Sequence, residues 1–490
     1  MSSTPESLGS KTVRSVSYKA IARFVSYGLQ GLTTVVLAQN LSAKDYGIVG
    51  YATIFIGFLA SFNDVGVGSA IVQRKQLDDL TLDTAFVLRI GLGLAAFAAA
   101  WLVAPFAGSS FGDAAVTSVI RLLSVGFLIG ILGFIPRAIL QREMEFGRCV
   151  VAALAGSVFR ATVACILAVR GFGYWSIVVG TTIGSMAEVF CFMCFSKNRI
   201  QLNWSKGVAK ELVGFGLPLF ATGLLTFALF NTDNFIIGSV AGASMLGYYA
   251  LAFNWGSIFS LAIYDVLHSV LFPAFARIQN DPALLRRMYL NMMEQLAVIG
   301  VLVQAGILAC SRDFLVVVLG NGAEKWLPAC HALQILSVYG LIRLLIEPLG
   351  NVVIALGRTN LLLRANLLAT LFEIAFLYPA LKFGGIEGVA VLVTVSYSLQ
   401  CAYYWPFLSK YLDLRAKDLR NLLFPSLAAA ALAVTGGLFV SHALPVNLAS
   451  LCAEIATVTF IFIVVQGVLS SWRWTGAWRT LLVNRKLLQN

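Results

Sequence analysis

Charged side chains are scarce in this sequence. They make up 12% of its 490 residues, against about 25% in ordinary soluble domains, whereas hydrophobic residues make up 59%. There is no Gly-rich phosphate loop of the kind that binds ATP, and no set of cysteines and histidines at the spacing of metal ligands. We therefore expect no metal, no cofactor and no direct use of ATP. The composition indicates an all-α integral membrane protein.

The net charge of +12 does not indicate a nucleic-acid-binding protein. Such proteins gather their basic residues on one face or arm, whereas here these residues are spread over many short loops between apolar segments. In membrane proteins the cytoplasmic loops carry an excess of Lys and Arg. We expect the basic residues to set the orientation of the chain in a bilayer, and we expect no nucleic-acid partner.

Fourteen apolar segments are long enough to span a membrane. A helix of about 20 residues crosses the roughly 30 Å of hydrocarbon. The sequence predicts such helices near residues 15–40, 46–72, 84–107, 115–137, 148–169, 173–196, 210–240, 246–275, 290–310, 326–356, 360–381, 386–409, 422–442 and 449–470. Lys and Arg concentrate in alternate loops, and the opposite loops carry only Lys44, Arg170, Arg312, Lys325 and Lys382. This pattern predicts that both termini are cytoplasmic.

Short motifs recur at a nearly constant offset along the chain. Leu-Ser-Val occurs at 123–125 and 336–338, a proline at 136 and 348, and Gly-Arg at 147–148 and 357–358, which are offsets of 213, 212 and 210. We interpret the first twelve helices as two parallel six-helix repeats, followed by two added helices. The predicted divisions are a cytoplasmic tail at 1–13, an N-terminal bundle at 14–200, a C-terminal bundle at 201–412, and the added helices with a cytoplasmic tail at 413–490.

Several basic residues lie within the predicted spans, where an ionisable group costs about 3 kcal/mol and usually faces a wet interior. Lys19 and Arg23 are one helical turn apart, and they either reach the headgroups or hold an anion in a cavity open to the cytoplasm. Arg89 has the same two explanations, of which reaching the headgroups is the simpler. Arg160 lies in the middle of its span, which favours the cavity.

Arg343 and Glu347 are also four residues apart, so they can pair on one face of the tenth span. They occur in the second repeat only. One hypothesis is a structural ion pair that satisfies itself. The other is that Arg343 binds an anionic group of the cargo and Glu347 holds Arg343 in place, with Pro348 loosening the helix beside them.

Four carboxylates within the spans are candidates for ion coupling, because transporters often relay protons through buried acids. They are Asp64, Asp233, Asp265 and Glu373. Asp233, which has asparagines nearby on both sides, is also explained as a polar clamp between helices. We favour the clamp for that residue.

Several motifs at the helix ends point to a known family. They are Leu41-Ser42-x-x-Asp45-Tyr46-Gly47, Asp64-x-Gly66, Asp233-Asn234-x-x-x-Gly238, Leu246-Gly247-Tyr248-Tyr249, Arg137-Ala138-x-Leu140-Gln141-Arg142 and Phe146-Gly147-Arg148. With these motifs and a 6+6+2 arrangement, the chain resembles the multidrug/oligosaccharidyl-lipid/polysaccharide exporter superfamily over about residues 12–412. Within that superfamily it is most similar to the polysaccharide branch, which handles exopolysaccharide and colanic-acid-type repeat units.

The resemblance implies an alternating-access flippase of the bacterial inner membrane. Its cargo would be an undecaprenyl-diphosphate-linked oligosaccharide, and membrane lipids, a polysaccharide polymerase and export machinery are the other partners implied. Arg or Lys would hold the diphosphate through charge-assisted hydrogen bonds. A lipid II flippase, a multidrug or cation antiporter of the same fold, and a membrane glycan polymerase or ligase remain as alternatives. The basic first span favours an anionic cargo, and the short outer loops argue against an enzyme.

Overall fold

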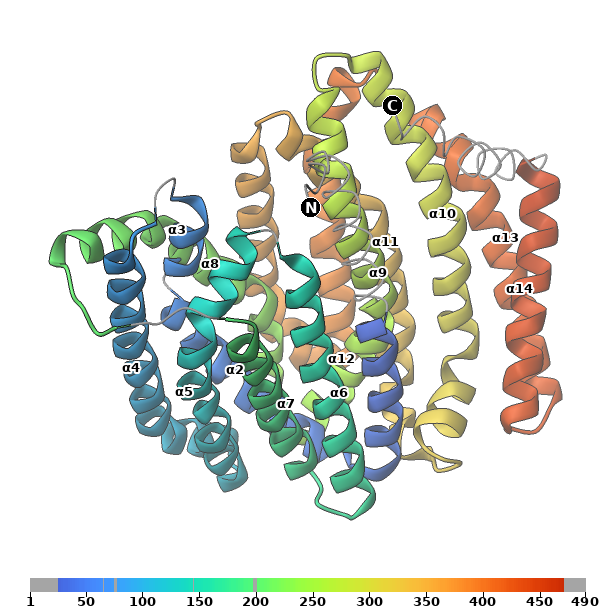
Figure 1. Cartoon of the computed structure of the whole chain (residues 1–490). Helices are drawn as coiled ribbons and strands as arrows, with labels where there is room; N and C mark the ends of the chain where they lie inside the picture. Colours follow the sequence, from blue (N-terminus) through green and yellow to red (C-terminus); the bar gives the residue numbers. More distant parts are fainter. Residues whose placement is uncertain (1–24, 65, 75–76, 144, 197–200, 471–490) are drawn as a thin grey trace, which may run out of the picture. The chain divides into compact units, whose positions relative to one another are not determined.

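The computed structural model describes residues 25–64, 66–74, 77–143, 145–196 and 201–470, and the regular structure in this part is entirely helical (Figure 1). The chain forms two compact units, Met1–Ala250 and Leu251–Asn490. These units divide about fifty residues later than the predicted bundles, whose boundaries remain a prediction.

In the first unit, residues 25–40 are helical. The helices that follow are α2 (Ala43–Asp64), α3 (Val67–Gln73), α4 (Asp79–Phe111), α5 (Ala114–Arg142), α6 (Phe146–Val169), α7 (Trp175–Phe195), α8 (Lys206–Ala241) and the first turns of α9 (Ala243–Arg277). Asp113 caps α5 by accepting a hydrogen bond from the amide of Ala115 at 2.9 Å. Ser205 caps α8 in the same way through the amide of Val208.

The second unit contains the rest of α9 and five further α-helices. They are α10 (Pro282–Asp313), α11 (Cys330–Ala355), α12 (Thr359–Tyr411), α13 (Ala416–Ala443) and α14 (Leu448–Ser470). A π-helical segment, Phe314–Leu319, and a 3₁₀ turn, Glu324–Ala329, join α10 to α11. Asp281 caps α10, and Pro282 stands at its first position, where a missing amide hydrogen has no cost.

The second predicted span, 46–72, is interrupted, which corrects the expectation of one continuous helix. The helix α2 ends at Asp64 and α3 begins at Val67, with Gly66 between them at φ +67°. A β-carbon on Gly66 would lie 2.6 Å from the α-carbon of Gly216, so the chain turns where only glycine fits. The Asp64-x-Gly66 motif therefore marks a break in the helix.

The 53-residue helix α12 is also broken. Gly385 adopts φ 58° and ψ −148°, a conformation restricted almost entirely to glycine, and it separates two helical segments. The break falls between the spans predicted at 360–381 and 386–409. In the described part of the chain, eleven helices are long and apolar enough to cross a membrane, with α12 counted once. The count of fourteen spans and the internal repeat remain predictions.

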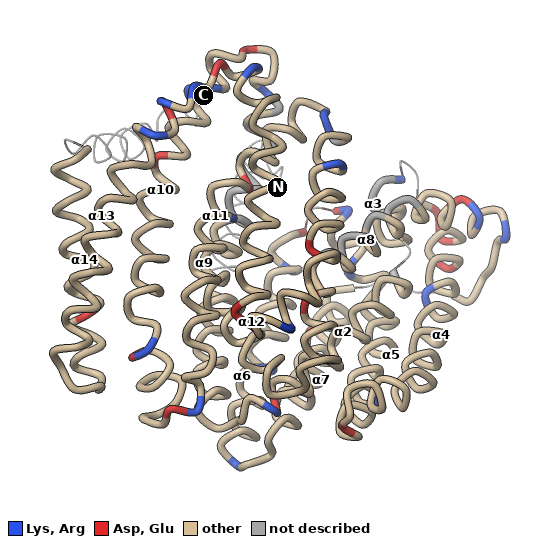
Figure 2. Tube along the Cα trace, turned by 180° about the vertical axis from the view of Figure 1, so that it is seen from behind, with Lys and Arg blue, Asp and Glu red and all other residues tan. Residues whose placement is uncertain are grey.

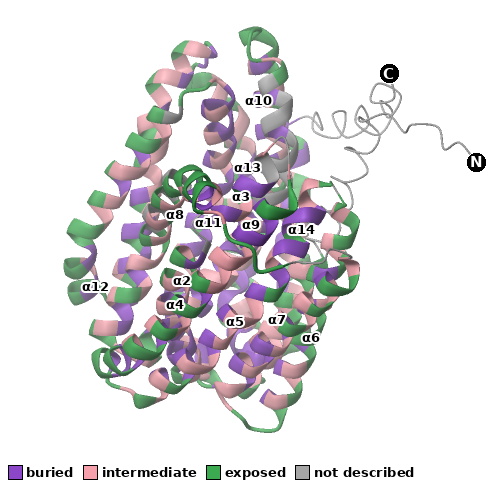
Figure 3. Cartoon of the chain, turned by 60° about the vertical axis from the view of Figure 1, so that its left-hand side comes forward, coloured by how far each residue is buried: buried purple, intermediate pink, exposed green. Residues whose placement is uncertain are grey.

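Large apolar side chains are exposed along the helices, as expected for a surface that faces lipid. Leu102 is 81% exposed and Phe439 is 75% exposed, although both lie within long apolar helices. Exposed positions run along the length of α12 (Figure 3). Most charged positions lie near the ends of the helices (Figure 2). The prediction of an all-α membrane protein is confirmed.

The first turns of α2 and α9 are in backbone contact. A β-carbon on Gly47 would lie 1.8 Å from the carbonyl oxygen of Ala243, and one on Gly247 would lie 1.8 Å from that of Ala43. The two contacts are reciprocal, because Gly247 follows Gly47, and Ala243 follows Ala43, by the same 200 positions in the sequence. Both glycines belong to motifs that carry the family resemblance, so these motifs have a packing role.

Asp45 joins the start of α2 to the loop before α7. Its carboxylate accepts hydrogen bonds from the amide of Ser42 at 2.9 Å and from the amide of Tyr174 at 3.2 Å. Beside it, Lys44 forms an ion pair with Asp113 at 2.8 Å. The acidic and basic residues of this loop region therefore tie three helix ends together.

Candidate functional site

A cavity of about 410 Å³ lies within the first unit between α3, α4, α5 and α7. We call it the α5 cavity, because most of the residues around it come from α5. The charged residues that line it are Arg89, Arg137 and Glu188. Gln141, Ser69 and Ser185 add uncharged polar groups. The lining therefore has two positive charges and one negative charge, with hydrogen-bonding groups between apolar surfaces.

Arg89 is held in place at the wall of this cavity. One guanidinium nitrogen donates a hydrogen bond to the carbonyl oxygen of Asn63, and the guanidinium carbon lies 4.9 Å from the centre of the Phe134 ring. A β-carbon on Gly130 would be 3.6 Å from the other terminal nitrogen, so the glycine leaves the guanidinium room. The structure thus places Arg89 at the wall of a cavity. Of its two explanations from the sequence, this position agrees with the one in which the residue faces a cavity.

Arg137 was not among the predicted site residues, although it also lines the α5 cavity. Its side chain is exposed, and it has no ion pair with any residue that the structure describes. The signal was present in the sequence, because Gly126, Gly130, Gly133, Arg137 and Gln141 are three or four positions apart. That spacing places them on one face of a helix. The glycines open this face, and the arginine and glutamine make it polar.

Glu188 approaches the cavity from α7. A β-carbon on Gly156 would lie 2.9 Å from the β-carbon of Glu188, so α6 must carry a glycine where the two helices meet. Glu188 and Arg137 do not form an ion pair with each other, although both line the same cavity. The carboxylate therefore remains available to accept a hydrogen bond from a hydroxyl group.

Arg343 and Glu347 form the expected ion pair on α11 in the second unit. The Nε atom of Arg343 lies 3.2 Å from Oε1 of Glu347, and their side chains are 9% and 18% exposed. Tyr397 donates its hydroxyl to the same Oε1 at 2.8 Å, and Arg343 donates to the hydroxyl of Tyr339 at 3.4 Å. The rings of Tyr339 and Tyr397 meet edge to face at 5.3 Å. Both charges thus have partners within the protein.

Asp233 also has a partner in a neighbouring helix. Tyr249 of α9 donates its hydroxyl to the Asp233 carboxylate of α8 at 2.8 Å, and the amide of Asn234 donates to the other oxygen at 2.7 Å. Asp233 is only 4% exposed. These contacts make an interhelical clamp, the role that we favoured for this residue.

Of the remaining predicted residues, those that the structure describes do not line the α5 cavity. Lys19 and Arg23 lie outside the described residues, and so do the side chains of Asp64 and Asp265. Arg160 is exposed on α6, and Glu373 is half-buried on α12. Their functional roles remain predictions.

The fold matches that of known membrane flippases. The solved structure of the lipid II flippase MurJ in an inward closed conformation superposes with a TM-score of 0.70, covering 91% of this chain and 97% of that one at 16% identity. At this identity the likeness shows the fold alone. The protein is therefore a multi-pass helical membrane protein with the fold of this flippase.

The chain belongs to the family described as polysaccharide biosynthesis protein, whose pattern matches residues 36–331. The lipopolysaccharide biosynthesis protein WzxC of Escherichia coli (strain K12) is 27% identical over 399 residues, which cover 80% of this chain and 79% of that protein. The teichuronic acid biosynthesis protein TuaB of Bacillus subtilis (strain 168) is 26% identical and covers 67% of this chain and 68% of its own length. The predicted family is confirmed.

Proposed function

We propose that this protein is an alternating-access flippase of the bacterial inner membrane, with both termini in the cytoplasm. Its cargo would be an undecaprenyl-diphosphate-linked oligosaccharide used to make exopolysaccharide or lipopolysaccharide. The family and the flippase fold support a transporter of a polysaccharide precursor. We propose transport and not catalysis as its activity.

The observation that carries the cargo class is the pair of arginines in the α5 cavity. A diphosphate presents several anionic oxygens, and guanidinium groups bind such oxygens through two parallel charge-assisted hydrogen bonds. Arg89 and Arg137 come from different helices and line one cavity. A lining with more positive than negative charge fits this anion better than the organic cation of a multidrug antiporter.

The other polar groups of the cavity fit the sugar. Hydroxyl groups of an oligosaccharide both donate and accept hydrogen bonds, and Glu188, Gln141 and Ser185 offer acceptors and donors at the same wall. In this proposal the arginines bind the diphosphate and these three residues contact the first sugars. Lys19, Arg23, Arg160, Arg343 and Glu347 remain candidates for further contacts, and Asp64, Asp265 and Glu373 for ion coupling.

Transport by purified protein tests this proposal. The full chain is reconstituted into vesicles with a fluorescent polyprenyl-diphosphate oligosaccharide, and the fraction accessible to a membrane-impermeant quencher is followed. We expect Arg89→Gln and Arg137→Gln each to slow transport about tenfold or more, because an arginine contact to a phosphate is charge-assisted. Arg148→Gln is the matched control, since Arg148 is exposed and lies outside the cavity.

Two results would overturn the proposal. One is an Arg89→Gln/Arg137→Gln double variant that transports the cargo at the wild-type rate. The other is wild-type protein that moves a fluorescent organic cation but not the diphosphate lipid. A lipid II analogue assayed in parallel distinguishes the peptidoglycan precursor from the polysaccharide precursor.

A further inference from the structure

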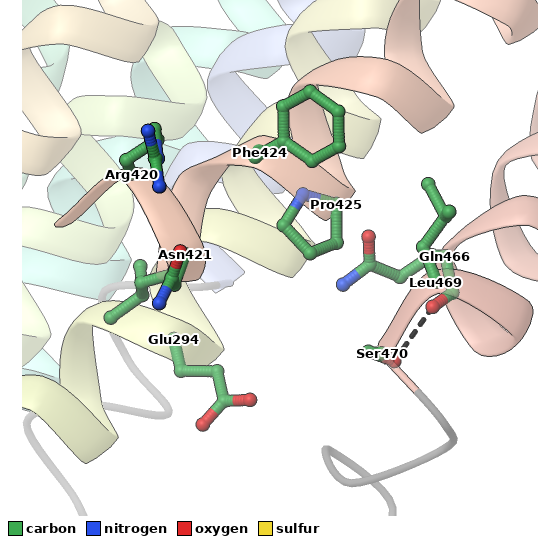
Figure 4. A pocket seen from close by; sticks show the side chains of 9 residues that line it. Glu294, Arg420, Asn421, Phe424, Pro425, Gln466, Leu469 and Ser470 are labelled. Carbon is green, nitrogen blue, oxygen red and sulfur yellow. Dashed lines mark hydrogen bonds between the residues drawn. The ribbon is translucent and has the colours of Figure 1, made fainter. Parts of the chain in front are cut away.

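A second cavity, of about 610 Å³, lies in the second unit between α10, α13 and α14 (Figure 4). It is separate from the α5 cavity, and the proposed cargo site does not use it. The polar residues that line it include Glu294 of α10, Arg420 and Asn421 of α13, and Gln466 of α14. Leu422, Phe424, Pro425 and Leu469 supply apolar walls.

Two opposite charges face this cavity without touching each other. Glu294 is half-buried and Arg420 is exposed, and no ion pair within 4.0 Å joins them. In Figure 4 the carboxylate of Glu294 and the guanidinium of Arg420 lie apart, with Asn421 between them in this view. A ligand that carries one charge of each sign complements both groups, whereas an anion alone would be repelled by Glu294.

Gln466 gives independent evidence that the cavity accommodates a polar ligand. Its side chain is only 3% exposed, and its Oε1 atom has no hydrogen-bond partner among the described residues. Figure 4 shows the amide of Gln466 directed from α14 toward Pro425 and Asn421 of α13. A buried amide oxygen without a partner is costly, by about 1–3 kcal/mol, and a donor from a ligand would remove that cost.

The position of the cavity fits a lipid headgroup. It lies where α13 begins and α14 ends, and the basic residues nearby place this end at the cytoplasmic side in the predicted topology. An ion pair at 2.7 Å between Arg286 of α10 and Asp418 of α13 connects the two helices near the same end. The cavity has both polar and apolar lining residues, which match the polar headgroup and the apolar acyl chains of a phospholipid.

We propose that this cavity binds the headgroup of a zwitterionic phospholipid, with the ammonium at Glu294 and the phosphate at Arg420. The ammonium also supplies a donor to Gln466. Bound lipid then fills the space between α10 and the helices α13 and α14. This lipid site shares no residue with the α5 cavity, so its test is independent of the flippase proposal.

Native mass spectrometry of the full chain in detergent tests the site with phosphatidylethanolamine and phosphatidylglycerol of identical acyl chains. We expect phosphatidylethanolamine to bind about three- to tenfold more tightly. Glu294→Gln should abolish this preference by weakening ethanolamine binding and strengthening glycerol binding. Arg420→Gln should weaken both lipids. Glu387→Gln and Arg312→Gln are matched controls outside the cavity, and they should change neither affinity.

Other outcomes contradict the proposal. Equal binding of the two lipids by the wild-type protein would show that the charges do not select the headgroup. A preference for phosphatidylethanolamine that persists in Glu294→Gln would place the lipid elsewhere. Gln466→Leu provides a further check, because it preserves the side-chain volume and should still weaken ethanolamine binding. If Gln466→Leu binds both lipids as the wild type does, the amide has no role.

Discussion

The guanidinium of Arg343 is held by the carboxylate of Glu347 at 3.2 Å, one helical turn further along α11. Since both side chains are largely buried and Tyr397 donates to the same carboxylate, the pair is complete without a ligand. This geometry supports a structural role, and contact with the cargo in another conformation is the alternative. A pair of variants separates the two.

We predict that Arg343→Met alone destabilises the protein by about 3–5 kcal/mol, because it leaves a buried carboxylate without its cation. The double change Arg343→Met/Glu347→Leu should restore most of that stability, since both charges are then removed. Thermal unfolding in detergent measures stability, and surface polysaccharide measures export. Normal export by the stable double variant would assign the pair to the fold, whereas loss of export would assign Arg343 to the cargo.

Tyr249→Phe should destabilise the first unit by about 1.5–3 kcal/mol, because it removes a hydrogen bond to the buried Asp233 carboxylate. Tyr378→Phe is the control, since Tyr378 is 55% exposed on α12. Thermal unfolding compares the two. If Asp233 instead couples transport to an ion, Asp233→Asn would change the dependence of transport on the imposed pH gradient, and Tyr249→Phe would have little effect on stability.

Gly47→Ala and Gly247→Ala should each cost about 1–3 kcal/mol, because the new methyl group overlaps a backbone carbonyl of the facing helix. Gly306→Ala is the matched control within α10, where nothing lies within 4 Å of the new β-carbon. There the change should be neutral or stabilising by up to about 1 kcal/mol. Equal melting temperatures for Gly47→Ala and Gly306→Ala would show that the α2 and α9 contact is looser than described.

The ion pair between Lys44 and Asp113 predicts a pH dependence of stability. The hydrogen bond from Lys44, helped by the amide of Ala115, lowers the pKa of Asp113. The stability that the ionised Asp113 contributes is therefore present above the ordinary aspartate pKa of about 3.9. This stability is lost as the pH falls through the lowered pKa of Asp113. The melting temperatures of the wild type and Asp113→Asn should differ at pH 6 and converge toward pH 3. A constant difference across this range would contradict the assignment.

The sequence predicts the helices well, including the separation of α12 at Gly385, but it misses the break at Gly66. Long apolar runs define helix positions, because each needs about 20 residues to cross a bilayer. Gly66 ends α2 inside such a run, and hydropathy alone has no signal for this. Gly66 is required at this break because it packs against the backbone of Gly216, about 150 residues away in the sequence. Breaks of this kind depend on tertiary contacts, which one sequence does not display.

Of the two arginines that line the α5 cavity, the sequence predicts Arg89 as a site residue but not Arg137. Arg89 is identifiable from the sequence because a charge inside an apolar span is unusual, whereas Arg137 lies near the end of its span and within a family motif. The offset of 213 residues relates Arg343 to Gly130. In the first unit the guanidinium beside that position comes from Arg89 on the neighbouring helix. An alignment of the predicted repeats does not reveal this, because the charge comes from a different helix.

The contacts of Gly47 with Ala243 and of Gly247 with Ala43 have the form of an isologous interface, in which residue i meets residue j and j meets i. The crossing of α2 and α9 therefore follows a two-fold pattern, which the predicted internal repeat would require. It follows that Gly47→Ala and Gly247→Ala should disturb the same crossing of α2 and α9.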